Sequence, residues 1–143
     1  MRSRIPQSEL EHLGRVPLFS GCSRRELREI AQLGTEVEIA EGTKLTKERA
    51  PGREFFLLLQ GEAECSIRGT TSGVLGPGDY FGELSLIDGG PRMATITAVT
   101  PLKVTVLSAS EFKGLLDASP TIATKLLVNV TGRLRDAQAS AIY

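Results

Sequence analysis

Residues 78–97 read Gly-Asp-Tyr-Phe-Gly-Glu-Leu-Ser-Leu-Ile-Asp-Gly-Gly-Pro-Arg-Met-Ala-Thr-Ile-Thr. An acid, Glu83, and a guanidinium, Arg92, stand at the two ends of a short turn that glycines bound. Glycine and other small residues between them leave backbone N–H groups open to a ligand. A carboxylate can accept hydrogen bonds from sugar hydroxyls, and the planar fork of arginine can hold a phosphate. These residues favour a site for a sugar phosphate.

The bulk composition fits a small intracellular domain. The chain has 143 residues, about one domain, and 17 basic and 17 acidic residues leave it with no net charge. It therefore lacks the charge typical of proteins that bind nucleic acid or an anionic membrane. Its two cysteines form no CxxC pair, which favours a reducing, cytoplasmic setting and excludes a four-thiolate metal site within the chain. With no apolar signal core, we expect neither secretion nor a membrane segment.

The first part of the chain, residues 8–35, is predicted to be helical. Two pairs of residues have the spacing of capping boxes: Ser8 with Glu11, and Ser23 with Glu26. Pro17 and Gly21 divide the segment into two short helices.

The middle part, residues 36–107, changes to a β-type pattern. Glycine or proline interrupts it every eight to twelve residues. The β-type runs lie at 36–39, 54–59, 63–67, 94–99 and 103–107. Many short strands at this spacing are typical of an antiparallel sandwich or barrel.

The last part, residues 108–138, returns to helix. Ser108 with Glu111 has the spacing to cap a short helix. Ser119 followed by Pro120 is typical of an N-cap with proline at the first helical position. This final helix is predicted to run to near Gln138.

An apolar stripe follows one face of that helix. Its members recur at alternating steps of four and three: Ala123, Leu127, Val130, Leu134, Ala137 and Ala141. Two partners fit the stripe equally, the domain's own β-layer or the same helix of a second copy. Ile122 and Leu126 lie beside it and suit an intramolecular face, which leaves Leu127 and Leu134 for a homodimer.

Parts of residues 78–97 resemble a motif of a known family. Phe81-Gly-Glu-Leu-Ser-Leu-Ile and Gly90-Pro-Arg-Met-Ala-Thr closely resemble the phosphate-binding cassette of cyclic nucleotide-binding domains. Catabolite activator proteins, protein kinase A regulatory subunits and cyclic-nucleotide-gated channels carry such domains. The resemblance extends to Val16-Pro-Leu-Phe-Ser and to Gly52-Arg-Glu-Phe-Phe-Leu-Leu-Leu-Gln-Gly.

The resemblance implies a mainly β fold with flanking helices. Residues 1–143 would form a single domain whose centre, residues 36–107, is an eight-stranded antiparallel β-roll of the double-stranded β-helix or jelly-roll type. The cassette would span residues 81–95. N-terminal helices would precede the roll, and a short helix and a long lid helix would follow it.

The resemblance also implies roles within the cassette. Glu83 would accept a hydrogen bond from the ribose 2′-hydroxyl, and Arg92 would pair with the cyclic phosphate. The other expected ligand-binding residues are Gly82, Leu84 and Ser85, through backbone groups, and Met93 and Ala94. A buried Arg92 without nucleotide is expected to hold water, another anion or Glu83, because an unpaired buried charge is costly.

We expect the residue after the cassette arginine to influence which base the site prefers. Members that prefer cyclic GMP resemble one another in having threonine there, whereas Met93 has no hydrogen-bond donor. The sequence thus favours cyclic AMP over cyclic GMP. Candidate contacts to the base are Val74 and Leu75 from the β-region, and Gln138, Arg133 or Arg135, with Asn129, from the last helix.

The expected mechanism is a ligand-driven switch without catalysis, cofactor or metal, in which the last helix closes over the base. Three alternatives remain. The domain could be a degenerate interaction scaffold that binds no nucleotide, although such members usually lose the acid or the arginine. A cupin-like metal enzyme would need clustered histidines, and the chain has one, His12. A haem or iron–sulfur sensor would need a cysteine set or a ligand histidine near the site, whereas Cys22 and Cys65 lie elsewhere.

Overall fold

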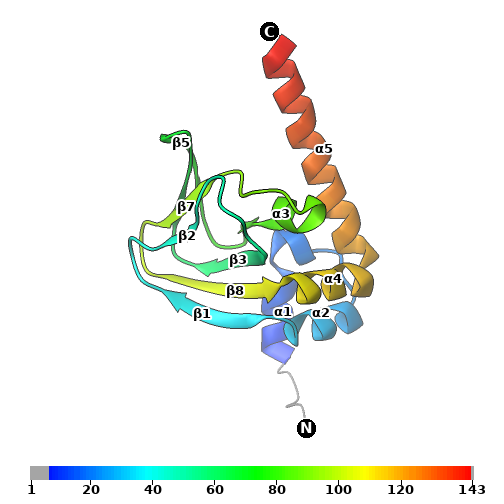
Figure 1. Cartoon of the computed structure of the whole chain (residues 1–143). Coiled ribbons are helices and arrows are strands. Elements are labelled where there is room, and N and C mark those ends of the chain that lie inside the picture. The colour runs from blue at the N-terminus through cyan, green and yellow to red at the C-terminus, as the bar shows by residue number, and fades with distance from the viewer. Residues whose placement is uncertain (1–6, 143) are drawn as a thin grey trace. The chain divides into compact units, whose positions relative to one another are not determined.

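The structure, a computed structural model, describes residues 7–142, and the chain groups into two compact units (Figure 1). The β unit spans residues 33–113. The helical unit combines the residues up to 32 with those from 114 onward.

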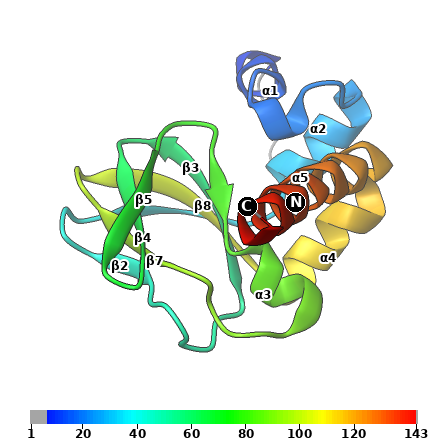
Figure 2. The ribbon, with the colours of Figure 1, turned by 90° about the horizontal axis from the view of Figure 1, so that it is seen from above.

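The β unit contains two antiparallel sheets of four strands each, among the described residues. One sheet has the order β1-β8-β3-β6 and the other β2-β7-β4-β5, and Figure 2 shows the four strands of the second sheet together. The strands are β1 (Thr35–Ile39), β2 (Lys44–Thr46), β3 (Glu54–Gln60), β4 (Ala63–Ile67), β5 (Thr70–Leu75), β6 (Tyr80–Phe81), β7 (Thr95–Ala98) and β8 (Leu102–Ser108). The predicted eight-stranded antiparallel β-roll is confirmed.

The strand β3 is buried on both faces, which explains its unbroken apolar run. Because side chains alternate along a strand, Phe56 and Leu58 point into the core shared by the two sheets. On the opposite face, the Phe55 ring packs 5.0 Å from the ring of Phe112 and 5.7 Å from that of Tyr80. The buried core between the sheets consists of Phe56, Leu58, Ala63, Phe81, Ile96, Ala98, Leu102 and Val104.

Three of the strands were not among the runs predicted from the sequence. β2 has three residues and β6 has two, too few for an alternating pattern to be recognised. β5 is almost entirely exposed and contains Gly73, so it lacks the apolar alternation of a half-buried strand. Its pairing with β4 makes it a strand.

The helical unit contains α1 (Gln7–Gly14), a 3₁₀ turn at Pro17–Phe19, α2 (Arg24–Ala31) and α5 (Pro120–Ile142). The helix α4 (Ala109–Ala118) leads from the β unit into this unit. α1 is described from Gln7, so the backbone of Ser8 is already helical, and the predicted capping box of Ser8 with Glu11 depends on a side chain outside the described ones. One predicted boundary was wrong. α5 continues past Gln138 because no glycine or proline stops it there.

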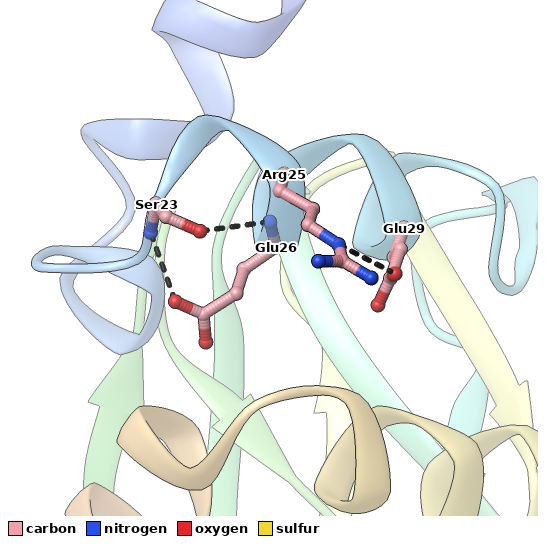
Figure 3. A network of polar contacts seen from close by, with 4 residues as sticks. All are labelled: Ser23, Arg25, Glu26 and Glu29. Atoms are coloured by element: carbon pink, nitrogen blue, oxygen red, sulfur yellow. Dashed lines mark hydrogen bonds and ion pairs between the residues drawn. The ribbon is translucent and has the colours of Figure 1, made fainter.

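The predicted caps at Ser23, Ser108 and Ser119 are confirmed. Ser23 Oγ accepts a 3.1 Å hydrogen bond from Glu26 N, and Ser23 N donates to Glu26 Oε1 at 3.0 Å (Figure 3). The second capping box joins Ser108 and Glu111 through bonds of 2.9 and 3.2 Å. Ser119 Oγ accepts from Ile122 N at 3.2 Å at the start of α5.

The carboxylate of Glu26 serves two helices of this unit at once. Besides the bond from Ser23, it accepts a hydrogen bond from the Ser119 hydroxyl, whose side chain is completely buried. The bond from Ser119, followed by those from Ser23, lowers the pKa of Glu26 below its usual value. The first turn of α2 and the first turn of α5 are thus joined by one ionised carboxylate.

We therefore expect this unit to lose stability in acid. Because the folded state holds Glu26 below its unfolded pKa, its contribution is present at neutral pH and is lost as the pH falls below about 4. Glu26→Gln should be less stable than the native chain at pH 7, and the difference should shrink on acidification. Urea denaturation followed by circular dichroism across pH 3–7 measures it.

The control is Glu29→Gln, at the exposed glutamate that forms a 3.9 Å surface ion pair with Arg25 (Figure 3). Surface pairs contribute little, so this change should cost less than Glu26→Gln at pH 7. A stability difference between the native chain and Glu26→Gln that stayed constant from pH 7 to pH 3 would contradict the assignment.

Candidate ligand-binding site

The cassette contains a helix that the sequence analysis treated as part of a turn. Between β6 and β7 lies α3 (Glu83–Asp88), which begins after Gly82 and ends before Gly89. Both glycines have left-handed backbones, with φ of 96° and 72°, a conformation that other residues rarely adopt. Gly89 N closes the helix by donating to Ser85 O at 3.0 Å. The two glycines therefore set the start and the end of α3.

Two opposite charges of the cassette are buried. The exposed fraction of Glu83, the first residue of α3, is 2%, and that of Arg92 is 6%. Glutamate and arginine are almost never fully buried unless they are paired. Ser85, one turn into the same helix, is also buried. Glu83 and Arg92, the acid and the guanidinium expected to bind ribose and phosphate, therefore lie in the interior of the cassette.

Backbone oxygens hold the Arg92 guanidinium. Nη1 donates to Gly82 O at 3.2 Å and Nη2 donates to Glu54 O at 2.9 Å. The guanidinium carbon lies 5.9 Å from the centre of the Phe56 ring, within cation–π range. Burial lowers the pKa of Arg92, while the carboxylates of Glu54 and Glu83 oppose this shift. The guanidinium still keeps its charge, since arginine is not deprotonated in proteins.

Two residues that contribute to the site, Glu54 and Gly52, were not predicted from the sequence. Glu54 contributes its backbone carbonyl, a group that every residue has, so the residue type does not predict this role. Gly52 faces Arg92 so closely that a Cβ atom there would overlap the guanidinium. A glycine just before a strand is a usable signal for such a close approach.

The other predicted cassette residues lie close to Glu83 or Arg92 in the sequence. Leu84 is half-buried within α3, and Ala94 is half-buried directly before β7. Met93 is 63% exposed.

Of the candidates for the base, Val74 is exposed and Leu75 is half-buried. Both lie on β5, the edge strand that β4 separates from β7. Their contact with a base stays a prediction.

The other base candidates belong to the helical unit. Arg133, Arg135 and Gln138 are all exposed on α5, and their contact with a ligand also stays a prediction.

The two apolar residues beside the α5 stripe are buried, whereas much of the stripe itself is exposed. Ile122 and Leu126 are buried, with exposed fractions of 0% and 3%. Leu127 and Leu134 are 67% and 58% exposed, Ala137 is exposed, and Val130 is half-buried.

Two absences concern only the part of the chain that the structure describes. Among these residues, no three His, Cys, Asp or Glu side chains gather where they could hold a metal ion. None of the helices there has the length and apolar character needed to cross a membrane.

The sequence model of the cyclic nucleotide-binding domain matches residues 36–119, which run from β1 through the cassette to the start of α5. The chain belongs to this family. A cyclic nucleotide-binding domain is a regulatory module, and the β-roll and cassette described above are its characteristic parts.

The chain is similar to regulatory proteins of two kinds. It is 39% identical over 117 residues to a cAMP-dependent protein kinase regulatory subunit of Emericella nidulans, covering 80% of this chain and 28% of the relative. The chain thus spans less than a third of that relative's length. Among solved structures, the catabolite activator protein of Thermus thermophilus superimposes with a TM-score of 0.79 at 27% identity, covering 87% of this chain and 61% of that chain. The cAMP-bound PfPKA-R structure gives 0.77 at 28% identity, covering 92% and 46%.

The close approach at Gly82 predicts a destabilising substitution. A Cβ at Gly82 would lie 2.5 Å from Glu54 O and 2.9 Å from Arg92 Nη1, in addition to the cost of the left-handed backbone. Gly82→Ala should lower the free energy of unfolding by more than the roughly 1–2 kcal/mol expected for the backbone alone. Urea denaturation measures this change.

Gly42→Ala is the matched control, because Gly42 has a similar φ of 85° but no neighbouring atom within 4 Å of a Cβ. It should show the backbone cost alone. Equal losses in the two variants would refute a steric role for the contact between Gly82 and Glu54.

Proposed function

We propose that this chain binds cyclic AMP at the cassette and transmits binding as a conformational change, without catalysing a reaction. The observation that carries the proposal is the burial of one acid and one guanidinium, Glu83 and Arg92, in a single segment of this family's cassette. Cyclic AMP offers a hydroxyl to the first and an anionic phosphate to the second. The cAMP-bound structure of a similar protein is consistent with this choice.

Arg92 recognises the cyclic phosphate. It donates two hydrogen bonds to carbonyl oxygens, so part of its set of five N–H donors remains for an anion. Hydrogen bonds between charged partners are stronger than neutral ones. The planar fork of arginine can also hold a phosphate through two parallel hydrogen bonds. The dominant attraction for the ligand is therefore electrostatic.

The first turn of α3 supplies the second part of the site. Glu83 accepts from the ribose 2′-hydroxyl. Gly82, at the N-cap, has no side chain with which to cap the helix, so backbone groups of Gly82, Leu84 and Ser85 are available to the phosphate and ribose.

Adenine is preferred over guanine because the exposed side chain beside Arg92 is apolar. Met93 offers no donor to a guanine carbonyl and can pack on either base. Val74 and Leu75 extend this apolar contact, and Gln138, Arg133 or Arg135 of α5 caps the base.

Binding closes α5 over the base. The nucleotide shifts the balance between open and closed states only by the difference in its affinity for the two. The α5 stripe packs on the same helix of a second copy through exposed Leu127, Leu134 and Ala137 and half-buried Val130, so the chain acts as a homodimer.

One observation favours a second function. The hydrogen bonds from Arg92 to two carbonyl oxygens would also hold the cassette together in an interaction scaffold that binds no nucleotide. A titration separates the two functions.

We expect the native chain to bind cyclic AMP more tightly than cyclic GMP in isothermal titration calorimetry. Arg92→Ala should weaken cyclic AMP binding at least about tenfold, since it removes charge-assisted hydrogen bonds. Arg92→Lys should restore only part of the affinity because lysine lacks the planar fork.

Arg25→Ala is the control, since Arg25 is an exposed arginine of α2. It should leave affinity unchanged. If Arg92→Ala bound cyclic AMP as tightly as the native chain, the phosphate assignment would fail. No heat and no thermal shift with the native chain at millimolar nucleotide would favour the scaffold.

The proposed homodimer can be tested by a substitution on the α5 stripe. Leu134→Glu places a charge on the exposed stripe and should convert the dimer to a monomer in sedimentation equilibrium. Asp136→Asn, at an exposed position of α5 outside the stripe, should leave the dimer intact. A native chain that stayed monomeric at high concentration, with and without cyclic AMP, would contradict this proposal.

A further inference from the structure

We propose that Gly52 is a positioning residue for phosphate recognition. Because it has no side chain, it leaves room for the slot that orients the Arg92 guanidinium. This inference rests on the proposed function, in which Arg92 binds the phosphate. Gly52 itself does not touch the nucleotide in this proposal and acts only through the guanidinium of Arg92.

The slot has walls on several sides of the guanidinium. On one side a Cβ at Gly52 would overlap Nε and Cζ and lie 2.6 Å from Nη2. On another, a Cβ at Gly82 would lie 2.9 Å from Nη1. The Phe56 ring lies 5.9 Å from Cζ, and Glu54 O accepts from Nη2 at 2.9 Å. Glycine at residue 52 therefore leaves the space that the guanidinium occupies.

The segment that carries Gly52 also holds the backbone of Arg92. Arg49 N donates to Arg92 O at 2.8 Å, and Arg92 N donates to Ala50 O at 2.9 Å. Arg49 itself has a φ of 70°, unusual for a residue with a side chain, which marks a tightly determined loop. The segment 49–52 thus fixes both the main chain and the side chain of Arg92.

A larger residue at position 52 would collide with the guanidinium of Arg92. The atoms in its way belong to the far end of a flexible side chain, which can move aside without shifting the backbone. The guanidinium would leave its carbonyl partners and lose the orientation that a two-point contact with phosphate requires. Gly52→Ala should therefore harm phosphate binding more than folding, in contrast to Gly82→Ala, which strikes the Glu54 carbonyl.

The first test compares affinities for cyclic AMP by calorimetry. Gly52→Ala should weaken binding about tenfold or more, the equivalent of one lost charge-assisted hydrogen bond. Gly73→Ala is the matched control, because Gly73 has no left-handed backbone and no atom within 4 Å of a Cβ. Its affinity should equal that of the native chain. An unchanged affinity in Gly52→Ala, in a protein whose binding Arg92→Ala weakens, would overturn the proposal.

The second test needs no nucleotide. In a double-mutant cycle read by urea denaturation, Gly52→Ala should lower the unfolding midpoint in the native background but have a smaller effect in the Arg92→Ala background, where the guanidinium is gone. Equal effects in the two backgrounds would overturn the slot. If the native chain proved not to bind cyclic AMP, the proposed function would fail, while this cycle would still decide whether Gly52 positions Arg92.

Discussion

The burial of one guanidinium constrains the structure of the whole cassette. A charged group in a protein interior is costly unless hydrogen bonds satisfy it. Arg92 meets this requirement through the carbonyl oxygens of Gly82 and Glu54. For Gly82 to present its carbonyl, the chain turns through a left-handed conformation directly before α3. For the guanidinium to reach Glu54, the residue at position 52 cannot carry a side chain.

The parts of the fold that could be predicted from the sequence depend on local partners. The capping boxes of Ser23 with Glu26 and of Ser108 with Glu111 join residues three apart, so their spacing predicts them directly. The strand β5 depends on its pairing with β4 and on little burial of its own, so its sequence lacks the alternation by which strands are recognised. α3 has six residues between two glycines, a length at which helix and turn have the same sequence signature.

In the candidate site, too, some residues could be predicted from the sequence and others could not. Glu83 and Arg92 could be identified because a particular charge is needed at each position. The partners of Arg92 lie 10 and 38 residues away and contribute backbone oxygens, which every residue possesses. The second contact of Glu26 has the same character, since Ser119 lies 93 residues further along the chain. Such contacts depend on how the strands and helices pack, and no residue type at either end predicts them.

The choice of carbonyl partners bears on how strongly the cassette attracts an anion. A carbonyl oxygen is a dipole, so it satisfies the N–H groups of Arg92 without cancelling the positive charge, whereas a carboxylate bound at the same place would neutralise it. Burial beside the Phe56 ring strengthens the electric field of that charge, because the local dielectric is lower than that of water. In the proposed function, an entering phosphate would meet an arginine that hydrogen bonds already orient, and its charge would add to those of the Glu54 and Glu83 carboxylates that act on the guanidinium. This arrangement would lower the ordering cost of such binding, since the two hydrogen bonds hold the long side chain in one orientation.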